Sequence, residues 1–256
     1  MKLSLKDKLK NKEVTIGSWI TIGHQVIAEI MSQFHFDWLT IDIEHSSISI
    51  SQVQSLIQII ELSGVTPLVR ISENDSTLIK RCMDSGSHGI IVPMVNNKDD
   101  AIKAVNSVKY PPIGKRGVGL ARAQKYGFGF EEYKNWVEKE SIVIVQIEHI
   151  DAVNNFESIM KTEGVDGFII GPYDLSASIG KPGDFECKEV KEALEYVKDL
   201  SKKLNITSGY HVIQPNPNEV KDKIIEGYSF IAFSIDSLLL GNACRKNLSS
   251  IKRGLK

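Results

Sequence analysis

The feature that most constrains the fold is a regular alternation of short apolar runs with longer amphipathic stretches, which continues from residue 14 to the C-terminus. Short apolar runs bounded by turn residues are typical of strands, and amphipathic stretches with helical spacing are typical of helices. Repeated strand and helix units indicate an α/β fold. The predicted strands are Thr15–Trp19, Trp38–Ile43, Thr66–Ile71, Gly89–Met94, Ile142–Ile147, Gly167–Gly171, Thr207–Val212 and Phe230–Ser234.

Most of these runs are apolar throughout, as expected for parallel strands that are covered on both faces. Helical spacing lies between them, for example in Gln52–Ser63 and Glu189–Lys203. Eight such strands in 256 residues match a (β/α)8 barrel, or TIM barrel. The main alternative is a doubly wound open sheet, which usually has a Gly-rich phosphate turn after its first strand, whereas here that strand ends in Ser18-Trp19-Ile20. We therefore predict one barrel domain over residues 1–256.

The segment from Lys109 to Tyr133 interrupts this rhythm, because it shows neither the strand period nor the helix period. It follows the fourth predicted strand. Loops of this length without secondary structure are uncommon unless they act as lids or binding loops. We expect this segment to cover one rim of the barrel.

Composition and charge exclude several classes of partner. Thirty-one basic and thirty-two acidic residues leave a formal charge of −1, so no net field favours nucleic acid or anionic membranes. The three cysteines are scattered and lack the spacing of a zinc or redox site. The N-terminus alternates lysine with leucine and resembles no secretory signal. We expect a cytoplasmic protein with reduced thiols that binds a small polar substrate.

Polar side chains gather at the predicted C-terminal ends of the strands, where a barrel carries its chemistry. They come from at least five different strands: Glu44, His45, Arg70, Gln146, Glu148, Asp174 and His211. Of the histidines, His45 is the best candidate for a general base, because it directly follows a strand that also brings two carboxylates. Arg70 ends an apolar strand and needs an anion, which is either a substrate or a structural partner such as Asp42 or Glu44.

Glu148 and Asp174 follow neighbouring strands and could share one metal ion. A carboxylate that ends an apolar run needs a partner to offset its loss of solvent, and an ion is one such partner. Oxygen ligands without cysteine favour a hard ion such as Mg²⁺ or Mn²⁺. Each carboxylate alone could equally be a surface ion pair or a helix cap, the latter especially for Asp174 before Leu175 and Ser176.

Lysine is absent from all eight predicted strands. An aldolase that forms a Schiff base needs a desolvated lysine on a barrel strand. Because this chain has none, an aldolase built on it would need a metal as the electron sink. The eighth strand runs into Ser234-Ile235-Asp236 without a pair of glycines, which gives little support to the usual phosphate site of such barrels.

Taken together, these residues resemble the HpcH/HpaI family of class II pyruvate aldolases, and the resemblance spans nearly the whole chain. The matching segments are Asp42–His45, Arg70, Val92–Val95, Tyr110–Gly117, Gln146–Glu148 and Gly171–Ser176.

The resemblance implies a barrel that assembles as a hexamer of paired subunits and reversibly splits 4-hydroxy-2-oxo acids into pyruvate and an aldehyde. It assigns a Mg²⁺, Mn²⁺ or Co²⁺ ion to Glu148 and Asp174. Pyruvate would be held by Gln146 and by the backbone around Gly171, Pro172, Tyr173 and Asp174. Arg70 would stabilise the enolate oxygen, and His45 would act as the base through a water.

The resemblance also assigns Asp84 the role of raising the basicity of the histidine. Asp84 closes the predicted helix after the third strand and should lie at the opposite barrel end, so a neighbouring subunit would have to supply it. Tyr173 stands where close relatives often carry a small residue, which puts the aldehyde pocket in question. Arg122, Lys125, His211 and Gln214 suggest a polyhydroxy or acidic aldehyde, although each could be a solvated surface group.

Two other functions remain open at this point. A citrate-lyase-like enzyme acting on an acyl-CoA ester would use the same metal ligands, and a barrel that only binds a metabolite would need none of the catalytic groups.

Overall fold

The strands close into a barrel in which every neighbouring pair is parallel, so the predicted (β/α)8 architecture is confirmed. The computed structural model describes residues 3–254. The eight strands follow one another around the barrel in chain order. They are β1 (Thr15–Ile20), β2 (Trp38–Asp42), β3 (Thr66–Arg70), β4 (Gly89–Val92), β5 (Ile142–Ile147), β6 (Gly167–Ile170), β7 (Ser208–Val212) and β8 (Phe230–Ile235).

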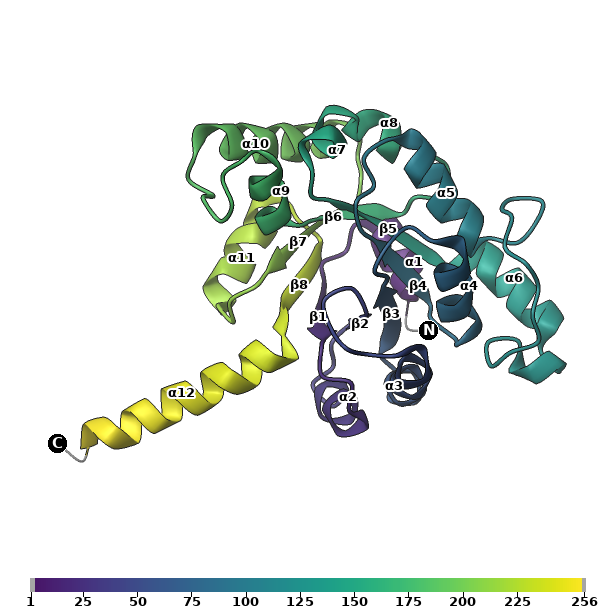
Figure 1. Cartoon of the computed structure of the whole chain (residues 1–256), viewed down its shortest axis with the longest axis horizontal. Coiled ribbons are helices and arrows are strands. Elements are labelled where there is room, and N and C mark those ends of the chain that lie inside the picture. Colours follow the sequence, from purple (N-terminus) through teal and green to yellow (C-terminus); the bar gives the residue numbers. More distant parts are fainter. Residues whose placement is uncertain (1–2, 255–256) are drawn as a thin grey trace.

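Helices connect successive strands and surround the barrel (Figure 1). They are α1 (Leu5–Asn11), α2 (Gln25–Ser32), α3 (Ile50–Leu62), α4 (Ser76–Asp84), α5 (Lys98–Val108), α6 (Phe130–Glu140), α7 (Ile150–Asn154), α8 (Phe156–Met160), α9 (Pro172–Ser178), α10 (Lys188–Lys203), α11 (Pro217–Glu226) and α12 (Asp236–Gly254), with a short 3-10 turn at Lys125–Gly127. Several begin at side-chain caps, and α3 has a full capping box between Ser49 and Gln52.

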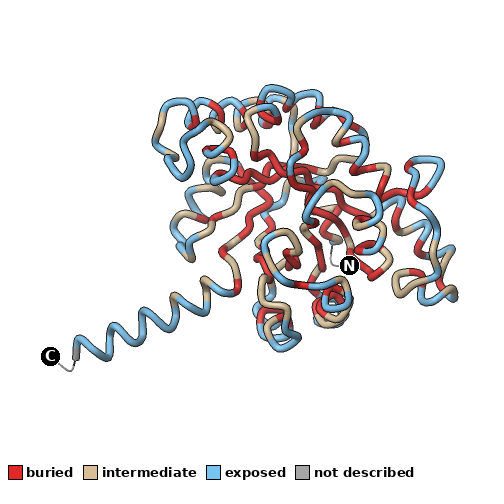
Figure 2. Tube along the Cα trace, viewed as in Figure 1, coloured by how far each residue is buried: buried red, intermediate tan, exposed pale blue. Residues whose placement is uncertain are grey.

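The interior of the barrel is filled by large apolar side chains. Figure 2 shows the strands that carry them as mostly buried. Successive residues of a strand point to opposite faces, so alternate positions of each strand meet inside. Trp38 stacks on Phe230 with ring centroids 4.2 Å apart. Gly17 makes room for this pair, because a Cβ there would lie 2.0 Å from the Trp38 ring. Burying each such ring stabilises the fold by roughly 1.5–3 kcal/mol.

Helix α1 covers the N-terminal end of the barrel. Leu5 and Leu9 pack against the interior side chains, and the Lys8 ammonium pairs with Asp37 at 2.6 Å, just before β2. The hydroxyl of Thr207, which precedes β7, donates to the Leu9 carbonyl at 2.6 Å. Within residues 3–254, α1 therefore covers the N-terminal end of the barrel.

The long irregular segment lies between α5 and α6, not directly after β4. Because α5 returns the chain to the N-terminal end, the loop covers that rim and not the rim where the polar strand ends gather. Arg116 holds it in place, with its guanidinium 4.2 Å from the centre of the Tyr110 ring and donating to the Tyr133 hydroxyl at 3.0 Å. Tyr133 itself belongs to α6, so the loop ends earlier than predicted.

Helix α12 extends away from the barrel (Figure 1), and Figure 2 shows it as exposed along most of its length. Leu240, Leu248 and Ile251 are each more than half exposed on it. Its first residue, Asp236, is anchored at the barrel, where its carboxylate accepts from the backbone amides of Thr21 at 2.9 Å and Ile22 at 2.8 Å.

Residues 3–254 include no helix that is both long and apolar enough to cross a membrane. All three cysteines are free.

Candidate active site

The centre of the candidate site is Glu148, which follows the last residue of β5 and points into the C-terminal mouth of the barrel. It is 3% exposed. Its Oε1 accepts from the Met94 backbone amide at 2.7 Å, and its Oε2 accepts from the side-chain amide of Gln146. Met94 has a left-handed backbone (φ 51°), which is costly for a residue with a side chain. That strained turn is what aims the amide at Glu148.

The carboxylates of Glu148, Glu44 and Asp174 lie near one another at the mouth, and the nearby positive charge does not neutralise all of them. Burial raises the pKa of Glu148 to about 7; the Met94 hydrogen bond opposes this, while the nearby charges of Glu44 and Asp174 add to it. The pKa of Glu44 is also raised to about 7, first by burial and then by Asp42 and Asp174, against the lowering effect of Arg70. The mouth therefore disfavours its own negative charge and would favour a bound cation.

Asp174 lies in the first turn of α9 and is open to solvent. The residue at the N-cap is Gly171, and no side chain caps this helix, so the helix-cap interpretation of Asp174 is not found. Pro172 occupies the first helical turn, where its missing N–H costs nothing. A Cβ on Gly171 would lie 2.9 Å from both Gln146 Nε2 and Glu148 Oε2, so only glycine fits between these groups.

Arg70 makes the structural ion pair that the sequence left open. Its Nε and Nη2 donate to the two oxygens of Asp42 at 2.9 and 2.6 Å, and Nε also lies 3.3 Å from Glu44 Oε2. The guanidinium stacks 4.4 Å from the centre of the Trp19 ring. These contacts fix Arg70 at the mouth.

Asp42 also organises the turn that carries His45. Its Oδ1 accepts from the backbone amides of Glu44 at 3.0 Å and His45 at 3.3 Å. The His45 side chain is 63% exposed, and the nearest acidic atom, Glu44 Oε2, is 3.9 Å from its Nε2. His45 is thus held by its backbone while its ring stays free to meet a substrate.

Asp84 does not join this group within one chain. It ends α4 at the N-terminal end of the barrel, as expected, where its Oδ1 accepts from Gln124 Nε2 at 3.1 Å. Arg122 and Lys125 are also at that end, paired with Glu61 and Glu132 respectively. The suggestion that these two cations contact the aldehyde is therefore not supported within the subunit.

Tyr173 is half exposed and packs edge-on against Phe185, with ring centroids 4.9 Å apart. Phe185 lies in the loop after α9, which is also held by a 2.9 Å hydrogen bond from the Gly183 amide to the Ser176 hydroxyl. The Tyr173 ring is thus turned toward this loop.

The donor set at the mouth fits a hard divalent ion. Glu148, Asp174, Glu44 and Gln146 offer only oxygen acceptors, and Glu44 Oε2 and Gln146 Oε1 are buried without a hydrogen-bond partner among the described residues. Residues 3–254 contain no group of three or more His, Cys, Asp or Glu side chains close enough to hold an ion on their own. An ion here would need ligands from substrate and water in addition to Glu148 and Asp174.

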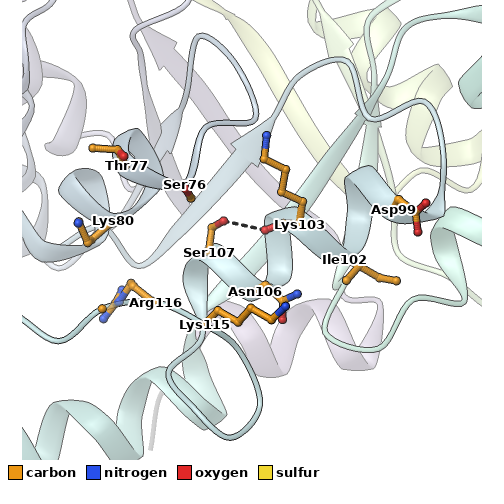
Figure 3. A pocket seen from close by; sticks show the side chains of 11 residues that line it. Ser76, Thr77, Lys80, Asp99, Ile102, Lys103, Asn106, Ser107, Lys115 and Arg116 are labelled. Atoms are coloured by element: carbon orange, nitrogen blue, oxygen red, sulfur yellow. Dashed lines mark hydrogen bonds between the residues drawn. The ribbon is translucent and has the colours of Figure 1, made fainter.

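A cavity of about 520 Å³ lies on the outside of the barrel between α4 and α5 (Figure 3). Lys80, Lys103 and Lys115 line it together with Asp99. None of the carboxylates of the mouth contributes to its wall. It is therefore separate from the candidate active site.

Glu44, Trp19 and His211 belong to this site more fully than the sequence indicated. The available signal was the strand period: Asp42 and Glu44 are two residues apart, as are Gly17 and Trp19, and Gly209 and His211. Trp19 meets His211 directly, and Arg70 contacts both Trp19 and Glu44, so these contacts depend on the closed barrel, which brings the ends of β1, β2, β3 and β7 around one opening.

Comparison with known proteins agrees with this geometry. Residues 15–243 match the model of the HpcH/HpaI aldolase/citrate lyase family. Over 251 residues the chain is 33% identical to a 2-keto-3-deoxy-L-rhamnonate aldolase of Escherichia coli O17:K52:H18, with 97% of this chain and 93% of the relative covered.

Two solved structures are also similar. The first is an HpcH/HpaI aldolase/citrate lyase family protein from Burkholderia cenocepacia J2315, with a TM-score of 0.91, 31% identity and coverage of 98% of this chain and 100% of the other. The second is an HpcH/HpaI aldolase from Desulfitobacterium hafniense DCB-2, with a TM-score of 0.88, 27% identity and coverage of 98% and 97%. The chain therefore belongs to the HpcH/HpaI aldolase/citrate lyase family, and the protein is an aldolase-type lyase.

Proposed function

We propose that the protein splits a 4-hydroxy-2-oxo acid reversibly into pyruvate and an aldehyde, and that a divalent ion on Glu148 and Asp174 supports the reaction. The observation that carries this proposal is the buried Glu148, which faces Asp174 and Glu44 while the nearby cation Arg70 is tied to Asp42. A divalent ion would offset this repulsion. Mg²⁺, Mn²⁺ and Co²⁺ are all compatible with the oxygen donors.

When bound, the ion would act as the Lewis acid that stabilises negative charge on the 2-oxo group. The protein's own part is to orient pyruvate. Gln146 and the backbone of Gly171, Pro172, Tyr173 and Asp174 would hold the pyruvate unit, because they border the space beside Glu148. The missing side chain at Gly171 leaves room for the side chains of Gln146 and Glu148.

Arg70 would stabilise the negative charge of the enolate, and His45 would accept the proton of the substrate hydroxyl. In the cleavage direction, His45 takes the proton of the C4 hydroxyl through a water, the bond between C3 and C4 breaks, and its electron pair moves onto the pyruvate enolate. Arg70 stabilises the enolate oxygen. Return of a proton to C3 gives pyruvate, while C4 leaves as the aldehyde carbonyl.

Asp84 is proposed to act on His45 across a subunit contact, within a homo-oligomer such as a hexamer. Support comes from its position at the far end of its own barrel and from unpartnered apolar surface. Val26, Ile30 and Phe34 are exposed at helical spacing on and just after α2, and α12 exposes a second apolar set. A monomeric variant with full activity would contradict this arrangement.

The free cysteines agree with a reducing, cytoplasmic location.

The test is an assay of pyruvate release, coupled to lactate dehydrogenase, with a panel of 4-hydroxy-2-oxo acids. We expect turnover that EDTA abolishes and that Mg²⁺, Mn²⁺ or Co²⁺ restores. Glu148→Gln should remove the restoration while leaving the fold intact by circular dichroism. Turnover that persists in EDTA would refute the metal-dependent mechanism.

An acyl-CoA lyase is the alternative within the same family. The relatives at about one-third identity are named as oxo-acid aldolases, which favours the oxo-acid reaction. Thioester cleavage in the same assay series, in place of pyruvate release, would reverse this choice.

A further inference from the structure

Asp84 lies at the C-terminus of α4 with one carboxylate oxygen held and the other free. Its Oδ1 accepts a hydrogen bond from Gln124 Nε2 at 3.1 Å. Its Oδ2 has no hydrogen bond within residues 3–254, and it is not among the buried atoms without a partner, so it keeps contact with solvent. A Cβ on Gly119 would lie 3.3 Å from Oδ2, so the loop passes this oxygen with a glycine. Asp84 can therefore offer one oxygen to a group outside its own chain.

Gln124 is a fully buried residue of the loop, and each polar atom of its side-chain amide has a partner. Its Oε1 accepts from the Ala121 backbone amide at 3.0 Å. A backbone N–H can only donate, so this bond fixes which atom of the side-chain amide is the oxygen. The two hydrogens of Nε2 then go to Asp84 at 3.1 Å and to the Tyr110 hydroxyl at 2.8 Å. The amide is thus locked in the orientation that donates to Asp84.

The loop around Gln124 is itself tied to the end of α4. The Ala123 backbone amide donates to the Asp84 carbonyl at 3.0 Å. Tyr110, the other acceptor of the Gln124 amide, is buried, and its ring centre lies 4.2 Å from the Arg116 guanidinium. Because buried neighbours already order this contact, it can act on a further group without an additional loss of side-chain entropy.

The surface beside Asp84 suits a second copy of this chain. Val118 and Leu120, on either side of Gly119, are 59% and 63% exposed. Exposed apolar side chains that lie close together often mark a contact between proteins. At the other end of the barrel, the His45 ring is exposed, and its nearest carboxylate oxygen is 3.9 Å away. The free carboxylate oxygen and the exposed imidazole are complementary groups at opposite ends of one subunit.

We propose that Gln124 is a positioning residue, which holds Asp84 so that Oδ2 accepts from the His45 ring of a neighbouring copy. The inference rests on the aldolase function and on the cross-subunit role of Asp84 proposed above. A carboxylate that accepts from one ring nitrogen fixes the orientation of the ring and leaves the other nitrogen as the acceptor for a water. Without Gln124 the Asp84 carboxylate is free to turn, and His45 is oriented for proton transfer for less of the time.

The first experiment measures kcat and KM for pyruvate release from 4-hydroxy-2-oxopentanoate with saturating Mn²⁺. Gln124→Leu keeps the approximate volume of the side chain and removes its bond to Asp84. Loss of a hydrogen bond to a charged group should lower kcat about tenfold, while KM stays within about twofold because no group proposed to bind pyruvate is changed. Lys125→Ala, at an exposed position of the same loop, is the matched control and should keep the wild-type kcat. Gln124→Met replaces Gln124→Leu if circular dichroism shows that the latter does not fold.

A double variant tests whether Gln124 acts through Asp84. Asp84→Asn should slow the reaction by itself, and the addition of Gln124→Leu should slow it no further, because residues that act as a unit are not additive. A purely structural contribution of Gln124 would instead multiply the two losses. Independent losses would overturn the proposal, and so would a Gln124→Leu enzyme with the wild-type kcat.

Mixed oligomers test whether Gln124 acts across subunits. A His45→Ala chain and a Gln124→Leu chain are produced together with different tags and purified through both. In such an oligomer an intact His45 lies on the Gln124→Leu chain and can meet Asp84 of the His45→Ala chain, where Gln124 is present. The activity per intact His45 should rise severalfold above that of the Gln124→Leu enzyme alone. No rise would place the effect within one barrel and refute the proposal.

Two results with the wild-type enzyme separate this proposal from the proposed function. Absence of pyruvate release from 4-hydroxy-2-oxopentanoate and from the whole panel of 4-hydroxy-2-oxo acids would refute the aldolase function, and the role of Gln124 with it. Full activity of a monomeric enzyme would leave the aldolase function standing and refute the roles of Asp84 and Gln124 alone.

Discussion

The two ends of strand β5 both carry buried charge, but they satisfy it differently. At the N-terminal end, the ammonium of Lys6 donates to the Ser141 carbonyl at 2.9 Å and pairs with Asp166. Lys109 reaches the carbonyls of Val137 and Glu138 at 2.8 and 2.9 Å. At the C-terminal end, Glu148 has two donors but faces two further carboxylates.

This contrast separates stability from function. The charges at the N-terminal end find their partners within the chain, so they hold the barrel together. In the function we propose, the carboxylates at the C-terminal end are neutralised by an ion from outside the chain. Substitutions at the N-terminal end should therefore lower the free energy of unfolding, and substitutions at the C-terminal end should lower the catalytic activity.

The largest effect is expected from replacing Glu148 and Asp174 together by alanine. Loss of both proposed ligands removes several kcal/mol of transition-state stabilisation, so metal-dependent pyruvate release should fall by more than about a thousandfold. The melting temperature checks that the double variant is still folded, because it loses the acceptor of the Met94 amide. Asp151→Ala, an exposed carboxylate on α7, is the matched control and should behave as the wild type. A double variant with full activity would refute the assignment.

His45→Ala should slow cleavage by about two to four decades, as expected for the loss of a general base. Because its side chain is exposed and is not a proposed ligand, Mn²⁺ affinity measured by calorimetry should stay within a few-fold of the wild-type value. Equal losses of metal affinity and activity would show that His45 acts by holding the ion.

Lys6→Met should act at the other end. It leaves Asp166, whose side chain is 13% exposed, without its cation, and breaking such a pair costs roughly 3–5 kcal/mol. Urea denaturation measures the loss, and kcat should remain near the wild-type value. Lys8→Met on the same helix removes a more exposed pair with Asp37 and should cost distinctly less. Equal costs would remove the distinction between a buried and a surface pair.

The smallest effect is a pH dependence. The pKa of Glu148 is raised from 4.5 to about 7 in the folded protein. Between these values the folded state binds more protons than the unfolded state, so the free energy of unfolding should fall as pH rises, by about 3 kcal/mol in EDTA. Saturating Mg²⁺ should reduce this fall, and Glu148→Gln should make it shallower, leaving the part that comes from the raised pKa of Glu44. Parallel curves for wild type and Glu148→Gln would contradict the raised pKa.

The barrel itself could be predicted from the sequence because the relevant signal is local. Each predicted strand overlaps an observed one, since an apolar run bounded by turns is visible within a few residues. The loop begins at Lys109, as predicted, but the rim that it covers could not be predicted because it depends on a helix, Lys98–Val108, that carries the chain to the N-terminal end. Arg122 and Lys125 were misplaced together with that loop.

The site was only partly predictable for a similar reason. Glu148 and Asp174 stand out because carboxylates after apolar strands are unusual. The clamp from Asp42 to Arg70 and the stack of Trp19 between Arg70 and His211 join four different strands. Sequence spacing gives the direction of each side chain but not which neighbours meet across a closed barrel.

Helix α12 has a consequence for how the protein responds to dilution. It packs on little of its own barrel and exposes Leu240, Leu248 and Ile251. In the assembly we propose, this surface is covered only when copies meet, so part of the stabilisation follows mass action and grows with protein concentration. The melting temperature should then rise with protein concentration. In a dilute preparation, α12 should be the first helix to lose its order.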